Sequence, residues 1–169
     1  DADRVVFPGV GAIRDCMGEI QRLNVGDVVS QAMKSKPVLA ICVGMQSLMT
    51  TSEENGGVAC LNQVPGEVTF FGSPHRASDG ARLKVPHMGW NTLTALRADP
   101  LLAGLQPTDR CYFVHGYFAS GRLPEVVATS EYGQSIAAVV RRNHVAGVQF
   151  HPERSGIVGA AILRNFLNS

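Results

Sequence analysis

The cysteine at position 42 lies where two sequence patterns meet. Residues 37–41 are apolar or compatible with a strand, and Met45, Leu48 and Met49 then recur at near-helical spacing. The small-x-Cys-x-Gly sequence between them indicates a sharp turn from a strand into a helix. Unpaired N–H groups at a helix start favour an anion, so we expect Cys42 to be held partly as a thiolate that attacks carbonyl carbons. The alternative interpretation is a buried, inert cysteine.

A candidate base and a carboxylate follow an apolar segment far along the chain. His151 and Glu153 come directly after the run 147–150 and are two residues apart, so in extended backbone they face the same side. Cysteine, histidine and glutamate brought together from the ends of different strands would form a nucleophile, a base and an orienting group. His115, in the apolar run 111–118, is a rival base. It has no carboxylate nearby in the sequence, so we favour His151.

The positions of these residues predict an α/β fold. Strands are expected at residues 4–7, 37–41, 65–72, 111–118, 126–129, 135–140 and 145–150. Helices are expected within 12–36, from the Cys42 turn to the polar stretch 52–57, and over 158–166. We predict a flavodoxin-like three-layer sandwich with a mostly parallel central sheet and a small antiparallel insertion. The site would lie at the carboxyl ends of the strands. His75, in the polar turn 73–80, is expected to be solvated.

Composition excludes several classes of protein. The chain has 169 residues, 45% of them hydrophobic, which suits one domain spanning residues 1–169. A net charge of +1 with scattered lysine and arginine argues against nucleic-acid binding. No apolar run is long enough to span a membrane, and no export leader is visible, so we expect a cytoplasmic protein. The four cysteines lack metal-ligand spacing, so neither a zinc site nor a disulfide framework is expected.

Five segments together resemble a known family. They are Ala40–Gln46, Phe150–Glu153, Phe7–Gly11, Pro86–Asn91 and Phe113–Tyr117. In this order they resemble the class I (triad) glutamine amidotransferases, and within them the glutaminase subunits of imidazole glycerol phosphate synthases of histidine biosynthesis. The resemblance implies hydrolysis of L-glutamine to glutamate and ammonia without a metal or organic cofactor. The ammonia would pass to a (β/α)₈ cyclase subunit.

The resemblance also implies roles for individual residues. Catalysis would use Cys42, His151 and Glu153, with the backbone N–H groups of Gly11 and Val43 as the oxyanion hole. Substrate binding would involve Gly9, Gly44, Gln46, Glu54, His115, Gly116 and Tyr117. The cyclase interface would include His87, Met88, Trp90, Asn91 and Arg154. The family commonly has serine or threonine at Gly116 and glycine at Ala40, and its further amino-terminal strand and helix are absent here, so we expect an amino-terminally truncated chain.

Three alternatives remain open at this stage. Another class I amidotransferase or a free glutaminase would keep the three catalytic residues but should lack the segment Pro86–Asn91. A cysteine peptidase-like hydrolase of the same fold would cleave peptides and leave glutamine intact. A catalytically impaired fragment would bind the partner only. Ammonia release from glutamine, measured with and without the synthase, separates such a fragment from an active glutaminase.

Overall fold

The computed structural model describes residues 2–73 and 75–169. The strands are β1 (Val5–Gly9), β2 (Val38–Cys42), β3 (Thr51–Ser52), β4 (Val58–Ala59), β5 (Glu67–Phe70), β6 (His75–Arg76), β7 (Arg82–Leu83), β8 (His87–Thr92), β9 (Thr94–Ala95), β10 (Arg110–His115), β11 (Tyr117–Ala119), β12 (Val126–Glu131), β13 (Ser135–Arg142) and β14 (Val145–Val148). The helices are α1 (Ile13–Arg22), α2 (Val25–Ser35), α3 (Val43–Ser47) and α4 (Gly156–Asn168), with 3₁₀ turns η1 (Glu54–Gly56), η2 (Pro100–Leu102) and η3 (Pro152–Arg154).

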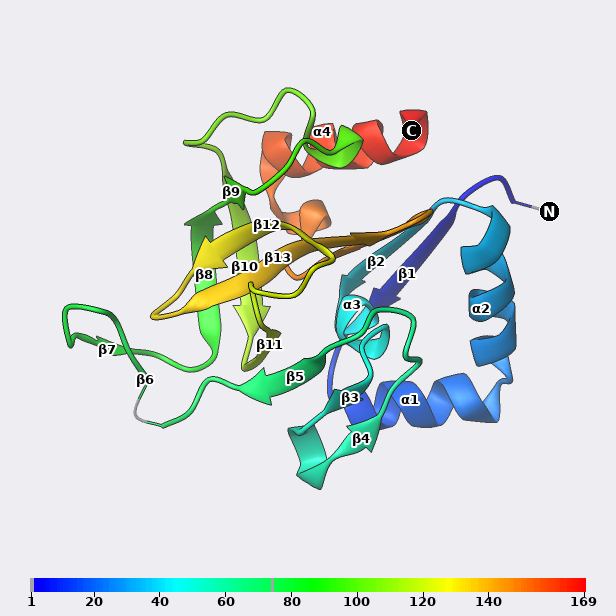
Figure 1. The fold of residues 1–169 in the computed structure, drawn as a ribbon, viewed down its shortest axis with the longest axis horizontal. Coiled ribbons are helices and arrows are strands. Elements are labelled where there is room, and N and C mark those ends of the chain that lie inside the picture. The colour runs from blue at the N-terminus through cyan, green and yellow to red at the C-terminus, as the bar shows by residue number, and fades with distance from the viewer. Residues whose placement is uncertain (1, 74) are drawn as a thin grey trace.

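The central sheet has the strand order β1-β2-β14-β13-β12-β9 (Figure 1). Strands β1, β2 and β14 run parallel, and the remaining pairs are antiparallel. The crossover through α1 and α2 allows β1 and β2 to be parallel, whereas the short turns joining β12, β13 and β14 permit only antiparallel pairing. The predicted α/β fold is confirmed. Its central sheet is mixed where a mostly parallel sheet was expected, because parallel pairing is confined to β1, β2 and β14.

Both faces of the central sheet are covered, which gives the expected layers. Every residue of β2 is buried, so this strand has no solvent-facing side. Leu39 belongs to an apolar cluster with Phe166 of α4, whereas its neighbour Val38 belongs to a second cluster with Val29 of α2. Because successive strand residues point to opposite faces, α4 and α2 cover opposite sides of the sheet. Cys42 therefore ends a strand that is buried along its whole length.

The helix predicted after Cys42 is shorter than expected. Helix α3 ends at Ser47, and β3 begins at Thr51, where the sequence pattern predicted a helix continuing to the polar stretch 52–57. The Leu48 carbonyl accepts hydrogen bonds from the backbone N–H groups of Gln63 and Val64, at 2.8 and 2.9 Å. These bonds occupy an acceptor that a next helical turn would need. The chain instead enters a small sheet of order β11-β5-β3-β4, and separate antiparallel pairs β10-β8 and β6-β7 lie beside it.

His75 is buried, contrary to the expectation of a solvated turn. Its Nε2 lies 2.6 Å from the Tyr132 carbonyl oxygen, and its ring stacks on the Tyr132 ring at a centroid distance of 5.6 Å. The polar residues around it predicted solvent exposure, but the β6–β7 hairpin brings this ring against the aromatic side chains of the domain. Within the described residues, no helix is both long and apolar enough to cross a membrane.

Candidate active site

Cys42 stands on a tight turn whose backbone conformation few residues adopt. Its φ and ψ are 54° and −114° as β2 ends and α3 begins. A Cβ at Gly44 would lie 2.1 Å from the Phe7 carbonyl oxygen, and one at Gly9 would lie 2.5 Å from the Gly44 nitrogen. Glycine at both positions therefore lets α3 approach β1 closely. Neither glycine is among the residues that line the cavity beside Cys42, and the close contacts give both a packing role.

His151 and Glu153 form a short hydrogen-bonded pair. His151 Nδ1 lies 2.6 Å from Glu153 Oε1, and the His151 backbone N–H donates to the Tyr112 carbonyl at 2.9 Å. An ionised carboxylate can only accept, so Nδ1 carries a proton and donates it to Glu153. The Ser155 hydroxyl donates to the His151 carbonyl at 2.7 Å and helps to fix the start of η3. The pair thus holds the His151 ring in one orientation, with Nδ1 directed at the carboxylate.

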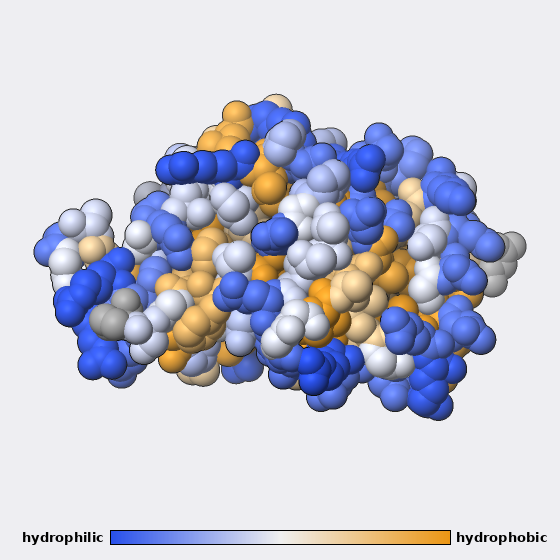
Figure 2. All heavy atoms as spheres, turned by 60° about the horizontal axis from the view of Figure 1, so that its bottom comes forward, coloured by the Kyte–Doolittle hydropathy of each residue, from blue (hydrophilic) through white to orange (hydrophobic). Residues whose placement is uncertain are grey.

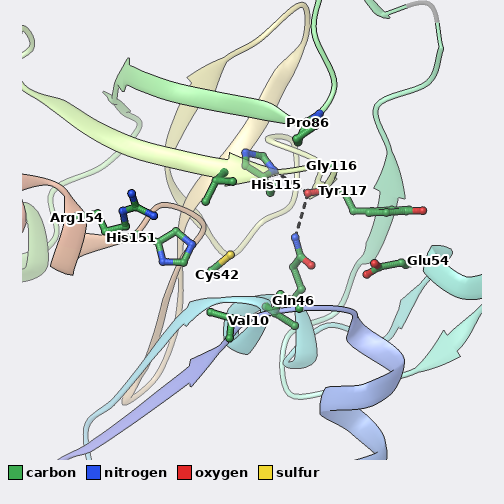
Figure 3. A pocket seen from close by; sticks show the side chains of 13 residues that line it. Val10, Cys42, Gln46, Glu54, Pro86, His115, Gly116, Tyr117, His151 and Arg154 are labelled. Carbon is green, nitrogen blue, oxygen red and sulfur yellow. Dashed lines mark hydrogen bonds between the residues drawn. The ribbon is translucent and has the colours of Figure 1, made fainter.

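Cys42 and His151 share one cavity of about 370 Å³, and Figure 3 draws them as neighbours on its wall. The lining residues are Val10, Gly11, Cys42, Val43, Gln46, Glu54, Pro86, Val114, His115, Gly116, Tyr117, His151 and Arg154. Most of the predicted catalytic, oxyanion-hole and substrate-binding residues are therefore brought together from β2, α3, η1, β10, β11 and η3. The cavity volume suits a ligand the size of an amino acid.

The Cys42 thiol is neutral at rest, which corrects the expected thiolate. Burial raises the pKa of the Cys42 thiol to about 11, and the negative charge of Glu153 adds to this. The Val43 backbone N–H and the Gln149 side chain act in the opposite direction and lower the pKa. Helix α3 has only five residues, so its dipole is small, and desolvation of the charged form prevails. The sulfur must lose its proton during the reaction.

His115 is a structural histidine, as its hydrogen bonds show. Its Nδ1 lies 2.7 Å from the Tyr117 carbonyl oxygen, so Nδ1 carries the proton, and its Nε2 lies 3.1 Å from His87 Nδ1. Burial lowers the pKa of His115 to about 3. Both ring nitrogens are engaged, so His115 cannot serve as the base, and the choice of His151 over this rival agrees with the geometry.

Glu54 and Gln46 both reach the cavity, although each also has an internal partner. Glu54 Oε2 accepts a hydrogen bond from the Ile13 backbone N–H at 3.2 Å and so caps the start of α1. Gln46 Nε2 donates to the Tyr117 carbonyl at 3.0 Å (Figure 3). The structure therefore fixes the orientation of the Gln46 amide, with its nitrogen toward the protein.

Side chains of the segment Pro86–Asn91 alternate between an exposed face and a buried face of β8. Met88 and Trp90 are 62% and 51% exposed, whereas His87 is buried against Phe113, so the prediction that His87 contacts a partner is wrong. Asn91 is partly buried, and its Nδ2 donates to the Glu131 carbonyl at 2.9 Å. The sequence pattern identified the segment, but a period of two decides which residues face outward.

The chain matches known proteins along almost its whole length. A family model described as glutamine amidotransferase class-I matches residues 2–169. The chain belongs to this family. The amidotransferase is 47% identical over 168 residues to the imidazole glycerol phosphate synthase subunit HisH of Pseudomonas putida, covering 99% of this chain and 79% of that protein. It is 48% identical over 169 residues to subunit HisH 1 of Pseudomonas aeruginosa, covering 99% and 78%.

Solved structures support the fold of the amidotransferase independently. A putative GMP synthase component from Thermoplasma acidophilum superimposes with a TM-score of 0.68 at 20% identity, covering 98% of this chain and 71% of that one. A second structure, titled glutamine amidotransferase, gives the same TM-score at 18% identity, covering 98% and 78%. At these identities the likeness shows a shared α/β architecture.

The sequence patterns did not predict one buried polar residue of the amidotransferase site. Gln149 is fully buried, and its side chain contacts both Gln46 and Cys42. A polar residue inside the apolar run 145–150 was the available signal, because buried amides need specific partners. Among the described residues, no group of three histidine, cysteine, aspartate or glutamate side chains is arranged to hold a metal ion.

Proposed function

We propose that this amidotransferase hydrolyses the side-chain amide of L-glutamine and supplies the ammonia to the cyclase subunit of an imidazole glycerol phosphate synthase. The observation that carries the proposal is Cys42 on its strained turn in the same cavity as His151, whose Nδ1 is 2.6 Å from Glu153. The names of the relatives at 47–48% identity support the choice of pathway. A cytoplasmic location suits a working thiol, because the cytoplasm keeps cysteines reduced.

The reaction begins with proton transfer from Cys42 to His151. The S–H bond breaks as Nε2 takes the proton, and the sulfur electron pair forms a bond to the amide carbon of glutamine. The amide oxygen becomes an oxyanion, which the backbone N–H groups of Val43 and Gly11 stabilise. Glu153 stabilises the imidazolium. Thiol–imidazole contacts in free enzymes often tighten only when substrate is bound.

The second half of the reaction reverses these roles. The His151 imidazolium gives its proton to the amide nitrogen, the C–N bond breaks, and ammonia leaves a thioester on Cys42. His151 then takes a proton from water, which attacks the thioester carbon and releases glutamate. The thiol is regenerated by return of that proton to the sulfur. No atom outside the protein, glutamine and water is needed.

Substrate orientation follows from the groups that remain available in the cavity. Gln46 directs its nitrogen to the Tyr117 carbonyl, so it offers an oxygen to the substrate and suits an N–H group better than a carboxylate. Glu54 supplies negative charge at the side of the cavity and suits the α-ammonium group. The backbone from His115 to Tyr117 lines the opposite wall, where Gly116 leaves room for substrate.

The partner surface is proposed to surround the mouth of this cavity. Val10 and Arg154 line the cavity, and the Val10 residue is 75% exposed. On β8, Met88 and Trp90 are exposed as well. The Arg154 guanidinium lies 4.8 Å from the centre of the Tyr112 ring, which also contacts Trp90. Figure 2 shows apolar patches set among hydrophilic residues on the side of the molecule that faces downward in Figure 1. Exposed aromatic and methionine side chains are typical of interfaces.

The test is to measure ammonia release from glutamine by this chain, alone and mixed with the cyclase partner. We expect Cys42→Ala to abolish glutamine-dependent synthesis while ammonia-dependent synthesis by the complex continues. Cys60→Ala, a change at a half-buried cysteine outside the cavity, is the matched control and keeps both activities. Loss of both activities in Cys42→Ala would assign the cysteine a structural role. Hydrolysis that is full without partner and never coupled to synthesis would indicate a free glutaminase.

A further inference from the structure

Gln149 occupies a place that strand register makes adjacent to the nucleophile. Val148 of β14 pairs with Ile41 of β2 in parallel, so the next residues along, Gln149 and Cys42, emerge side by side at the carboxyl ends of the two strands. The backbone N–H of Gln149 donates to the Ala138 carbonyl at 2.9 Å, which extends the sheet by one residue. The side chain is fully buried, so both ends of its amide need partners inside the protein.

Both ends of the Gln149 amide have partners, and both belong to the site. Its Oε1 accepts from Gln46 Nε2 at 3.0 Å, and its Nε2 donates to Cys42 Sγ at 3.8 Å, within the range for sulfur acceptors. Gln149 therefore joins the residue that faces the substrate to the atom that attacks it. No side chain of the proposed triad makes this connection.

The orientation of the amide follows from a carbonyl that can only accept. The Tyr117 carbonyl oxygen lies 3.0 Å from Gln46, so the Gln46 group facing it must be the NH₂. The same NH₂ of Gln46 also faces Gln149, so Gln149 must present its Oε1 there. The NH₂ of Gln149 is therefore directed at the Cys42 sulfur. The Tyr117 carbonyl is itself held by His115 Nδ1 at 2.7 Å. The arrangement therefore directs an N–H group, and not an oxygen, at Cys42.

We propose that Gln149 is a catalytic residue of the glutamine hydrolysis, whose carboxamide N–H orients the Cys42 sulfur and stabilises the thiolate formed when His151 takes the thiol proton. The inference rests on the proposed function for the identity of the reaction. An N–H group directed at sulfur favours the charged form over the neutral one, and it opposes the effect of burial. The same bond assists thioester breakdown, since the sulfur leaves that step as a thiolate.

Two substitutions separate this role from simple packing. Gln149→Met keeps an unbranched side chain of similar size and removes the donor. Gln149→Glu keeps the shape, but its carboxylate replaces the donor with a negative charge. When protonated, that carboxyl regains an O–H donor and resembles the amide. Burial raises a carboxyl pKa, so we expect protonation on going from about pH 8 to about pH 6. Gln31→Met, on the exposed side of α2, is the matched control.

The measurements are kcat and KM for glutamine in the complex, and the rate at which iodoacetamide alkylates Cys42, followed on its peptide by mass spectrometry. Loss of a hydrogen bond to a charged group predicts that Gln149→Met lowers kcat and the alkylation rate by about 10- to 100-fold at every pH. For Gln149→Glu the loss should be as large at about pH 8 and should shrink by about 10-fold toward about pH 6. The control should match the unaltered protein.

Two results would overturn the proposal. One is a Gln149→Met protein whose kcat and alkylation rate stay within about 2-fold of Gln31→Met. The other is a Gln149→Glu protein whose activity relative to wild type does not change with pH. If Gln149→Met fails to fold, this second measurement alone tests the proposal. If the unaltered protein does not hydrolyse glutamine, the proposed function fails, whereas the alkylation rates still test the contact between Gln149 and sulfur.

Discussion

Replacing Glu153 with glutamine tests how the site stabilises charge. Glu153 Oε1 lies 2.6 Å from His151 Nδ1, and its negative charge faces the imidazolium that forms when Cys42 loses its proton. Glutamine has nearly the same shape and can present an oxygen to the same N–H group. The His151 tautomer and ring position are therefore retained, and the change isolates the charge.

The expected loss can be bounded from the exposure of the pair. Opposite charges about 4 Å apart attract by about 1 kcal/mol in water and by about 4 kcal/mol at an effective dielectric constant of about 20. The Glu153 side chain is 53% exposed and that of His151 is 7% exposed, so the pair lies between these limits. About 2 kcal/mol corresponds to a fall in kcat of about 30-fold. A fully buried triad carboxylate can contribute about 10⁴-fold, a value taken from serine proteases.

The assay is kcat for glutamine hydrolysis in the complex with the cyclase, measured at low and at high ionic strength. The 30-fold difference should shrink with salt, because the exposed side of Glu153 is screened. Glu19→Gln, which removes an exposed carboxylate paired with Arg22 at 2.6 Å on α1, is the control and should leave kcat unchanged. A loss beyond about 10³-fold would mean that Glu153 sets the tautomer, and a loss below about 3-fold would mean that its charge is unimportant. Either result refutes the reasoning.

Three further predictions concern stability. Gly44→Ala should lower the free energy of unfolding by about 3 kcal/mol or more, because its Cβ would lie 2.1 Å from the Phe7 carbonyl oxygen. Gly18→Ala, where nothing lies within 4 Å, should raise it by about 0.5–1 kcal/mol, and urea unfolding measures both. Burial lowers the pKa of His87 to about 4 and that of His115 to about 3, so the unfolded chain binds protons first as pH falls. Stability should be complete above about pH 6.5 and fall toward pH 4 by up to about 1.4 kcal/mol per pH unit for each histidine, and unchanged urea midpoints between pH 7 and pH 5 would contradict this.

The sequence was sufficient to predict the elements that repeat a simple pattern. The apolar spacing of residues 12–36 predicted the pair of helices α1 and α2, and the apolar run before Cys42 predicted the strand β2. The two-residue spacing of His151 and Glu153 predicted their contact, although η3 and not an extended strand provides it. These features depend on local periodicity, which the amino-acid order records directly.

The features that could not be predicted depend on contacts between distant segments. Helix α3 is short because the loop at Gln63 occupies the Leu48 carbonyl, and no local signal reports that bond. His87 was assigned to an interface because the resemblance places the whole segment Pro86–Asn91 there, whereas the pairing of β8 with β10 turns its ring inward. Gln149 was overlooked because its importance arises from the register between β14 and β2. Tertiary pairing decides each of these cases.

The high pKa of Cys42 also bears on how long the enzyme lasts. A thiol with a pKa of about 11 is ionised in only about one molecule in 10⁴ at neutral pH. Peroxides oxidise the thiolate form of cysteine and leave the protonated form largely untouched, so the idle enzyme resists conversion to sulfenic and sulfinic acids. The buried position that disfavours ionisation of the Cys42 thiol thereby protects the thiol from oxidation between turnovers.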